Sequence, residues 1–390
     1  MTNSRTTQSG TPEVQGRVDP RYTKVRDVFA EQLRAGELGA AVAITVDGEP
    51  VVDLWGGHAD PARTRPWTRD TLTHVYSVTK GMTALCAHVL LERGSLELDA
   101  PVARYWPEFA QAGKGAISVR WLLSHRAGLQ ALTQPLPPET LYDWNAMCAA
   151  LAAAKPCVEP GRIGYHPVTY GWLVGELVRR VDGRSLGRFF REEIAGPLGA
   201  DFHIGLGPAE EQRCADMRPL QPPPDFVKLL EAAPPGEPPL VMLAFMNPIG
   251  NGDHNSSAHR RAEIPAINGH GTALALARVY GALARGGEID GVRVLSRESV
   301  ERARALQAEG RDALLDLPIR MGLGFWLGQP GLRDFAFGPN PGAFGHPGAG
   351  GGLGCADPAA RVGFGYVTNG MGSSLAIDPR PAALLEAFYG

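Results

Sequence analysis

The chain has 390 residues, of which 44% are hydrophobic and 20% charged, and its formal net charge at pH 7 is −3. This composition is typical of a folded globular protein and excludes a disordered one. The near balance of charge gives no electrostatic reason to expect a nucleic-acid or membrane partner.

The first twenty residues are polar and lack the apolar segment of a secretory signal. We therefore expect a flexible tail over residues 1–20 and a cytoplasmic protein. No apolar stretch is long enough to span a bilayer. The five cysteines are odd in number and form no C-x-x-C pair, which predicts free thiols rather than disulfides or a structural zinc site.

Hydrophobic periodicity predicts an amphipathic helix over residues 22–35. A β-hairpin should follow, with strands at residues 40–46 and 49–54 around the turn Asp47-Gly48. A second helix is expected over residues 77–93, ending at Gly94.

The middle of the chain is Pro-rich, which indicates long loops between helices. The remaining expected elements are helices at residues 119–123, 168–181, 186–194, 272–285 and 381–388 and strands at residues 322–327, 351–356 and 362–367. This order predicts the α+β (α/β) class. Residues 21–110 and 260–390 would form a sheet domain, residues 111–259 a mainly helical domain, and the active site would lie in the cleft between them.

Ser77 and Lys80 are three residues apart, so on a helix that begins near Ser77 they lie on one face. A serine hydroxyl needs a base to become a nucleophile, and a lysine can serve as that base when burial lowers its pKa. A helix N-terminus would also favour an oxyanion developing at Ser77. The tetrapeptide alone is equally well explained by an N-cap serine and a lysine that extends to solvent.

Two further segments bear on this choice. Pro167 is suited to the first turn of a helix, which would leave Tyr165 in the loop before it, free to point into a cleft. The alternative is a tyrosine that only packs the helical region. Residues 344–351, FGHPGAGG, follow a predicted strand, and their glycines allow backbone amides to approach a ligand. The alternative is a plain turn with His346 on the surface.

Together these segments resemble the serine β-lactamase and penicillin-binding-protein superfamily, and specifically the family VIII carboxylesterases. Residues 77–80, SVTK, match the first motif, and residues 165–167, YHP, match the tyrosine motif, which is Y-x-N in class C β-lactamases. Residues 346–348, HPG, match the third motif, which is K-T-G in β-lactamases and often H-x-G in these esterases. Residues 122–129 and 268–278 also look like superfamily segments, so the resemblance covers nearly the whole chain from about residue 20.

The resemblance implies a β-lactamase-like fold, in which helices flank an antiparallel sheet. It also implies a serine carboxylesterase that hydrolyses short-chain or aryl esters through an acyl-enzyme on Ser77. Tyr165 with Lys80 would act as general base and then as acid, with Lys80 as the charge that lowers the pKa of Tyr165. The backbone amides of Ser77 and Ala349 would form the oxyanion hole.

The same resemblance assigns supporting roles. His346 would hold the Tyr165 hydroxyl, and Gly348 would support the same loop. Substrate contacts would come from Tyr76, His166 and Pro347. Neither a metal nor an organic cofactor is expected, the partner is a small-molecule ester, and the oligomeric state stays open.

Two departures from the β-lactamase motifs favour esters over antibiotics. Pro167 replaces the asparagine whose amide binds the substrate, and proline offers no such group. His346 replaces a lysine and is mostly neutral near pH 7. The alternatives are β-lactamase, D-aminopeptidase, amidase or acyltransferase activity at the same site, or a catalytically silent binding protein of this fold.

Two other patterns are expected to have no catalytic role. Residues 183–187, GRSLG, match the G-x-S-x-G nucleophile elbow, but that motif needs a strand before the serine. A helix is predicted there instead, so Ser185 should cap the next helix. His254 and His259 lie close to Asp253 without a recognisable ligand spacing, which favours a polar loop over a metal site.

Overall fold

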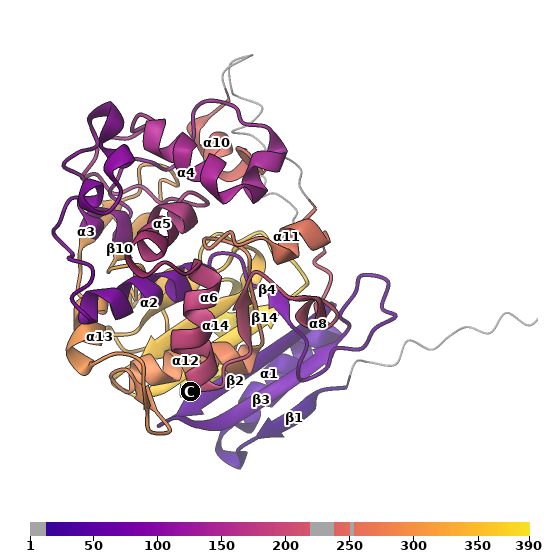
Figure 1. Ribbon diagram of the computed structural model, residues 1–390. Coiled ribbons are helices and arrows are strands. Elements are labelled where there is room, and N and C mark those ends of the chain that lie inside the picture. The colour runs from indigo at the N-terminus through magenta and orange to yellow at the C-terminus, as the bar shows by residue number, and fades with distance from the viewer. Residues whose placement is uncertain (1–12, 219–237, 250–252) are drawn as a thin grey trace, which may run out of the picture.

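The computed structural model describes residues 13–218, 238–249 and 253–390. Its centre is a nine-stranded sheet in the order β1-β3-β2-β14-β13-β12-β11-β10-β9, in which neighbouring strands run antiparallel (Figure 1). Strands from the two ends of the chain pair within this sheet, where Val42 of β2 lies opposite Tyr366 of β14. The predicted α+β class, with an antiparallel sheet flanked by helices, is confirmed.

The strands of the large sheet are β1 (Gln15–Val18), β2 (Gly39–Val46), β3 (Glu49–Gly57), β9 (Ala308–Arg311), β10 (Pro318–Met321), β11 (Trp326–Leu327), β12 (Phe344–Pro347), β13 (Leu353–Asp357) and β14 (Val362–Thr368). A second sheet joins β4 (Thr73–His74), β6 (Gly269–Gly271) and β5 (Phe202–Ile204), and a third joins β7 (Glu288–Ile289) and β8 (Val292–Arg293).

The α-helices are α1 (Thr23–Arg34), α2 (Thr79–Glu92), α3 (Val119–Leu123), α4 (Trp144–Ala153), α5 (Tyr170–Asp182), α6 (Leu186–Phe190), α7 (Gly196–Leu198), α8 (Pro208–Glu211), α10 (Leu240–Met246), α11 (Ser257–Arg261), α12 (Ala273–Ala284), α13 (Arg297–Arg304) and α14 (Pro379–Tyr389). Short 3-10 helices are η1 (Pro20–Tyr22), η2 (Val102–Arg104), η3 (Pro107–Gly113), η4 (Pro138–Tyr142), η6 (Arg333–Phe335) and η7 (Ala349–Gly351).

Helices cover both faces of the large sheet. Val42 and Ile44 of β2 belong to the same buried cluster as residues of α1 and α14, whereas Ala43 belongs to the cluster that contains α12. This alternation follows from the two-residue period of a strand. Helix α12 packs so closely on β14 that a Cβ added to Gly365 would lie 2.2 Å from the carbonyl oxygen of Ala273.

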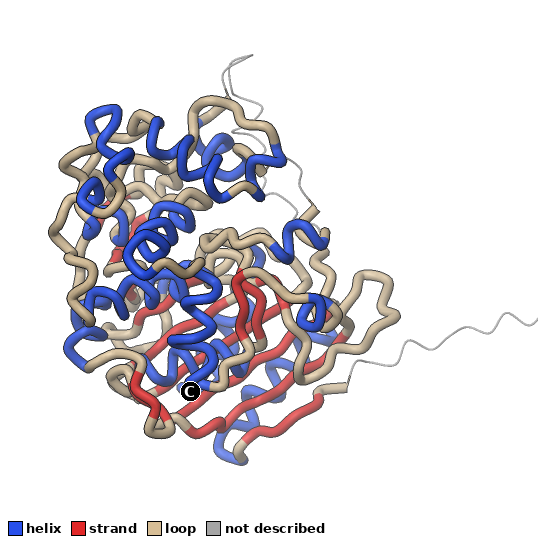
Figure 2. Tube along the Cα trace, viewed as in Figure 1, coloured by secondary structure: helices blue, strands red, loops and turns tan. Residues whose placement is uncertain are grey.

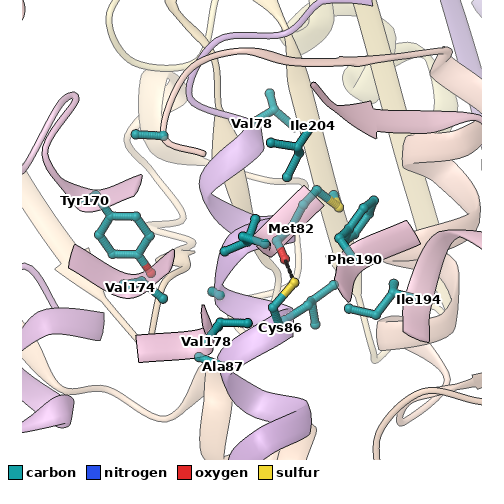
Figure 3. Packing of buried hydrophobic residues seen from close by; sticks show 14 of the residues in the cluster. Val78, Met82, Cys86, Ala87, Tyr170, Val174, Val178, Phe190, Ile194 and Ile204 are labelled. Carbon is teal, nitrogen blue, oxygen red and sulfur yellow. Dashed lines mark hydrogen bonds between the residues drawn. The ribbon is translucent and has the colours of Figure 1, made fainter. Parts of the chain in front are cut away.

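Helix α2 joins the sheet region to the helical middle of the chain. Every residue from 79 to 90 is buried. Figure 3 shows Met82 and Cys86 of α2 among side chains of α5, such as Val174, and Phe190 of α6. Figure 2 shows that helices and loops dominate the region above the strands. Because α2, α12 and these middle helices share one cluster, the division into two domains at residues 111 and 260 stays a prediction.

Most predicted elements are confirmed within about two residues, but two predictions were wrong. The segment expected to be a tail includes β1, which pairs with β3. Its polar sequence gave no strand signal, because an edge strand is held mainly by backbone hydrogen bonds. The expected strand at residues 322–327 is mainly a turn, closed by a hydrogen bond from Gly322 N to Phe325 O, with Gly324 at φ +89°. Residues 1–12 of the tail prediction and residues 219–237 of the Pro-rich segment lie outside the described residues.

Residues 186–194, predicted as one helix, are α6 followed by a π-helical turn, η5 (Arg191–Ala195). Across the described residues, no helix combines the length and the apolar character needed to cross a membrane.

Candidate active site

Ser77 lies in the turn that leads into α2. The helix begins at Thr79, two residues later than predicted. Tyr76, directly before the serine, has φ +46°, a left-handed conformation that costs a non-glycine residue roughly 1–3 kcal/mol. The hydroxyl of Thr79 donates to Tyr76 O at 2.5 Å and accepts from Gly269 N at 2.8 Å, which fixes this turn onto β6.

Lys80 is fully buried, and its Nζ has three oxygen neighbours. They are Ser77 Oγ at 3.0 Å, Pro167 O at 2.6 Å and Ala266 O at 3.0 Å. Burial holds the pKa of Lys80 well below its usual value. A neutral amine has two N–H groups and one lone pair, so it can donate to both carbonyls and present the lone pair to the serine hydroxyl. This geometry allows Lys80 to accept the proton of Ser77.

Pro167 lies before α5, which begins at Tyr170, rather than in the first turn of a helix as predicted. Its carbonyl is therefore outside the helix and accepts from Lys80.

Tyr165 completes the group around the serine. Its ring centroid is 4.9 Å from Lys80 Nζ. Burial is the main cause that raises the pKa of Tyr165, and the interaction with Ser77 lowers it only in part. Lys80 is not among the causes that lower the pKa of Tyr165, so the expected charge assignment, a protonated Lys80 that lowers the pKa of Tyr165, stays a prediction. Burial favours the neutral form of both groups, which would suit Lys80 as a proton acceptor and Tyr165 as a proton donor.

The third predicted segment packs against the turn that carries Ser77. A Cβ added to Gly348 would lie 2.3 Å from the carbonyl oxygen of Val75, so only glycine allows this approach. Among the hydrogen bonds of the described residues, none uses the backbone N–H of Ser77 or of Ala349. Two unused donors on adjacent segments are what an oxyanion hole requires.

His346 is fully buried and differs from its predicted role. Burial is the main cause that lowers its pKa to about 3, so the imidazole is neutral. Its Nδ1 bonds to Pro347 O at 2.7 Å, and its Nε2 has no partner. The expected hydrogen bond to the Tyr165 hydroxyl is absent, because Nδ1 is bonded to Pro347 O and Nε2 has no partner.

The three predicted substrate contacts fall in different environments. Tyr76 is partly exposed, whereas Pro347 is buried in β12. His166 is 1% exposed; its Nε2 accepts from Leu129 N at 3.1 Å and its backbone N–H donates to His125 Nδ1 at 3.0 Å. A histidine used in this way supports the Tyr165 loop, so the predicted substrate contact of His166 is corrected to a structural one.

Two residues that position Tyr165 were missed. Asp312, 2% exposed, accepts from Tyr165 N at 2.6 Å. The ring of His125 lies between Tyr165 and Tyr170, with centroid distances of 4.8 and 4.7 Å. Asp312 is 147 residues from Tyr165, and no sequence spacing signals such a contact. His125 falls in a segment that resembles the superfamily, but its pattern does not indicate a role.

The alternative nucleophile is excluded by its surroundings. Ser185 follows α5, a helix rather than a strand, and caps α6 by accepting from Arg188 N. Its hydroxyl donates to Glu263 Oε1 at 2.6 Å. The predicted capping role is confirmed.

This fold and serine site are shared with known proteins. The chain belongs to the Beta-lactamase family, whose model matches residues 25–387. It is 38% identical over 375 residues to "Esterase/beta-lactamase LipL" of Mycobacterium tuberculosis, which covers 92% of this chain and 84% of that protein.

Two solved structures are also similar. One is described as a family VIII carboxylesterase, with 41% identity and a TM-score of 0.88 over 97% of this chain and 99% of that one. The other is a penicillin-binding-protein homologue from Caulobacter crescentus, with 44% identity, a TM-score of 0.88 and the same coverage. The resemblance inferred from the three motifs is confirmed.

Proposed function

We propose that the protein is a serine carboxylesterase that hydrolyses short-chain or aryl carboxylic esters through an acyl-enzyme on Ser77. The observation that carries this proposal is the contact of 3.0 Å between Ser77 Oγ and the buried Nζ of Lys80, whose pKa is held low. The esterase names of similar proteins support it.

In the first half-reaction, neutral Lys80 accepts the proton of Ser77 while Oγ attacks the ester carbonyl. The N–H groups of Ser77 and Ala349 stabilise the tetrahedral oxyanion. As the carbon–oxygen bond of the ester breaks, Tyr165 gives its phenolic proton to the leaving alkoxide. The alcohol departs and leaves an acyl-enzyme, a phenolate and an ammonium.

In the second half-reaction, water attacks the acyl carbon and gives a proton to the phenolate of Tyr165. The intermediate then collapses, and Ser77 Oγ leaves with the proton held by Lys80. Both groups return to their starting forms, and the net reaction converts ester and water into acid and alcohol.

The site favours esters over β-lactams for two reasons. At Pro167 only a backbone carbonyl is available, and that carbonyl binds Lys80. His346 is buried and neutral, so it offers no cation to the carboxylate of a β-lactam. β-Lactam hydrolysis is the second candidate, because the name of the Mycobacterium tuberculosis relative includes both activities.

The test combines covalent labelling with a substrate panel. Mass spectrometry after treatment with a fluorophosphonate probe should find the label on Ser77 and none on Ser185. p-Nitrophenyl acyl esters should be hydrolysed faster than a chromogenic cephalosporin, and Ser77→Ala should remove both activities. Absence of any ester turnover would favour a silent binding protein, and a faster cephalosporin rate would favour the second candidate.

We also propose that the protein acts in the cytoplasm. All five cysteines are free, and four of them are buried, as expected for a chain that folds in a reducing compartment. Cell fractionation with a compartment marker would test this localisation.

A further inference from the structure

Three histidine side chains converge beside the serine turn. His74 lies in β4, His259 in α11, and His254 in the chain just before α11. The Nε2 of His259 is 3.3 Å from His74 Nε2 and 3.4 Å from His254 Nδ1. All three nitrogen atoms lie within 4.8 Å of one another.

Two of these separations match the edges of a metal tetrahedron. Zinc binds imidazole nitrogen at about 2.0–2.1 Å, so two ligands of a tetrahedral ion are about 3.3 Å apart. The contacts of His259 already have this length. The remaining pair lies within 4.8 Å, so it must close by at most about 1.5 Å, and His254 is the one partly exposed member of the group.

Hydrogen bonds cannot account for both close contacts of His259 Nε2. A ring nitrogen of imidazole has one position in its plane, occupied by a proton or by a lone pair. The Nε2 of His259 therefore cannot make good hydrogen bonds to His74 and His254 together. A metal ion placed among the three would accept all three lone pairs at once.

The surroundings of the cluster suit a cation. None of the three histidines is fully exposed, and the neutral imidazole is the form that binds metals. The nearby cation Arg260 is paired with Asp216 at 2.8 Å, which reduces its repulsion of a bound ion.

We propose that His74, His254 and His259 bind one divalent transition-metal ion, of which Zn²⁺ is the best match, with a fourth position open to water. Three imidazoles without a thiolate or carboxylate suit Zn²⁺, Cu²⁺ or Ni²⁺ rather than Ca²⁺ or Mg²⁺. Sequence spacing did not indicate this cluster, because His74 is 185 residues from His259.

The site is next to the catalytic group but separate from it. The ring of His74 lies 4.1 Å from that of Tyr76, the residue before Ser77. A bound ion would tie α11 to β4 and so restrain the serine turn, without taking part in ester hydrolysis. The proposal of this metal site does not depend on the proposed esterase activity.

The experiment measures metal binding directly. The full chain is treated with a chelator and desalted, one equivalent of Zn²⁺ is added, and retained metal is measured by elemental analysis after gel filtration. We expect one ion per chain and a melting temperature that rises with Zn²⁺ concentration. Co²⁺ should give the visible absorption bands of a tetrahedral site.

Variants distinguish this site from incidental binding. His254→Ala and His259→Ala should each lose the retained ion and the Co²⁺ bands, whereas His58→Ala, which is not a member of the cluster, should keep both. His254 is partly exposed, so its variant tests the site even if His259→Ala folds poorly. Wild-type protein that retains no Zn²⁺, or a His254→Ala variant that retains as much as wild type, would overturn the proposal.

Discussion

Two lysines, Lys80 and Lys114, are fully buried, and each is surrounded by three oxygen acceptors. Lys114 Nζ donates only to backbone carbonyls, at distances of 2.8, 2.9 and 2.5 Å. At Lys80 one of the three acceptors is a hydroxyl, that of Ser77. Each Nζ also lies near an aromatic ring, 5.3 Å from the centroid of Phe109 for Lys114 and 4.9 Å from that of Tyr165 for Lys80.

The difference between these lysines shows that burial alone does not indicate a catalytic base. Three carbonyls need three N–H donors, so the surroundings of Lys114 suit an ammonium that holds loops together. Two carbonyls and a hydroxyl suit a neutral amine, because the hydroxyl can supply a proton to the lone pair. Burial lowers the pKa of both side chains, but only that of Lys80 falls well below the usual value.

The largest effect should separate the two lysines. Lys80→Met should lower kcat for p-nitrophenyl esters by about 10²–10⁴-fold, because the serine loses its base. Lys114→Met should keep kcat but lower the melting temperature, because each carbonyl left unpaired costs about 1–3 kcal/mol. Equal kcat values for the two variants would contradict the assignment of Lys80 as base.

The next effect tests the direction of proton transfer at Tyr165. If the phenol protonates the leaving group, Tyr165→Phe should slow esters of simple alcohols more than p-nitrophenyl esters, whose leaving group needs little protonation. Fluorophosphonate labelling of Ser77 should fall less than ester turnover. A uniform loss across both ester classes would instead indicate that Tyr165 acts as the base.

The pH dependence should also identify Lys80. Below its folded-state pKa the amine is protonated and inactive, so kcat/KM should rise with pH, with a midpoint below that of an ordinary lysine. Neighbouring His166 and His346, each with a pKa of about 3, should not contribute above pH 5. Lys114→Met should leave the profile unchanged, and a midpoint at the ordinary lysine value of 10.5 would contradict this role.

The unfolding free energy should also depend on the titration of Lys80. Between the lowered pKa of Lys80 and the ordinary value of 10.5, the unfolded chain binds more protons than the folded one. The unfolding free energy therefore rises with pH across this window. Denaturant titrations of wild type and Lys80→Met should differ in this slope, and identical slopes would contradict the lowered pKa.

The smallest effect concerns Ser185. Ser185→Ala should leave ester hydrolysis unchanged and lower the unfolding free energy by about 0.5–2 kcal/mol, because α6 loses its cap. Denaturant titration and an esterase assay measure the two outcomes. Loss of activity in this variant would indicate that Ser185, rather than Ser77, is the nucleophile.

Features set by neighbouring residues could be predicted from the sequence, whereas contacts between distant residues could not. Periodicity located the helices, and short motifs located Ser77, Lys80 and Tyr165, because their patterns span a few residues. Contacts between distant parts of the chain had no local signal. Two examples are the hydrogen bond that the carboxylate of Asp312 accepts from Tyr165 N and the contact between His74 and His259. The protonation states also needed the structure, since they depend on burial.

The acceptors around Lys80 have a consequence for synthesis of the chain. Pro167 and Ala266, which supply the two carbonyls, follow the lysine by 87 and 186 residues. Until both have been made and docked, Lys80 is exposed to water and protonated, and Ser77 remains an ordinary alcohol. A nascent or truncated chain that ends before Ala266 should therefore be chemically inert, and the serine should become reactive only after the fold has closed around the lysine.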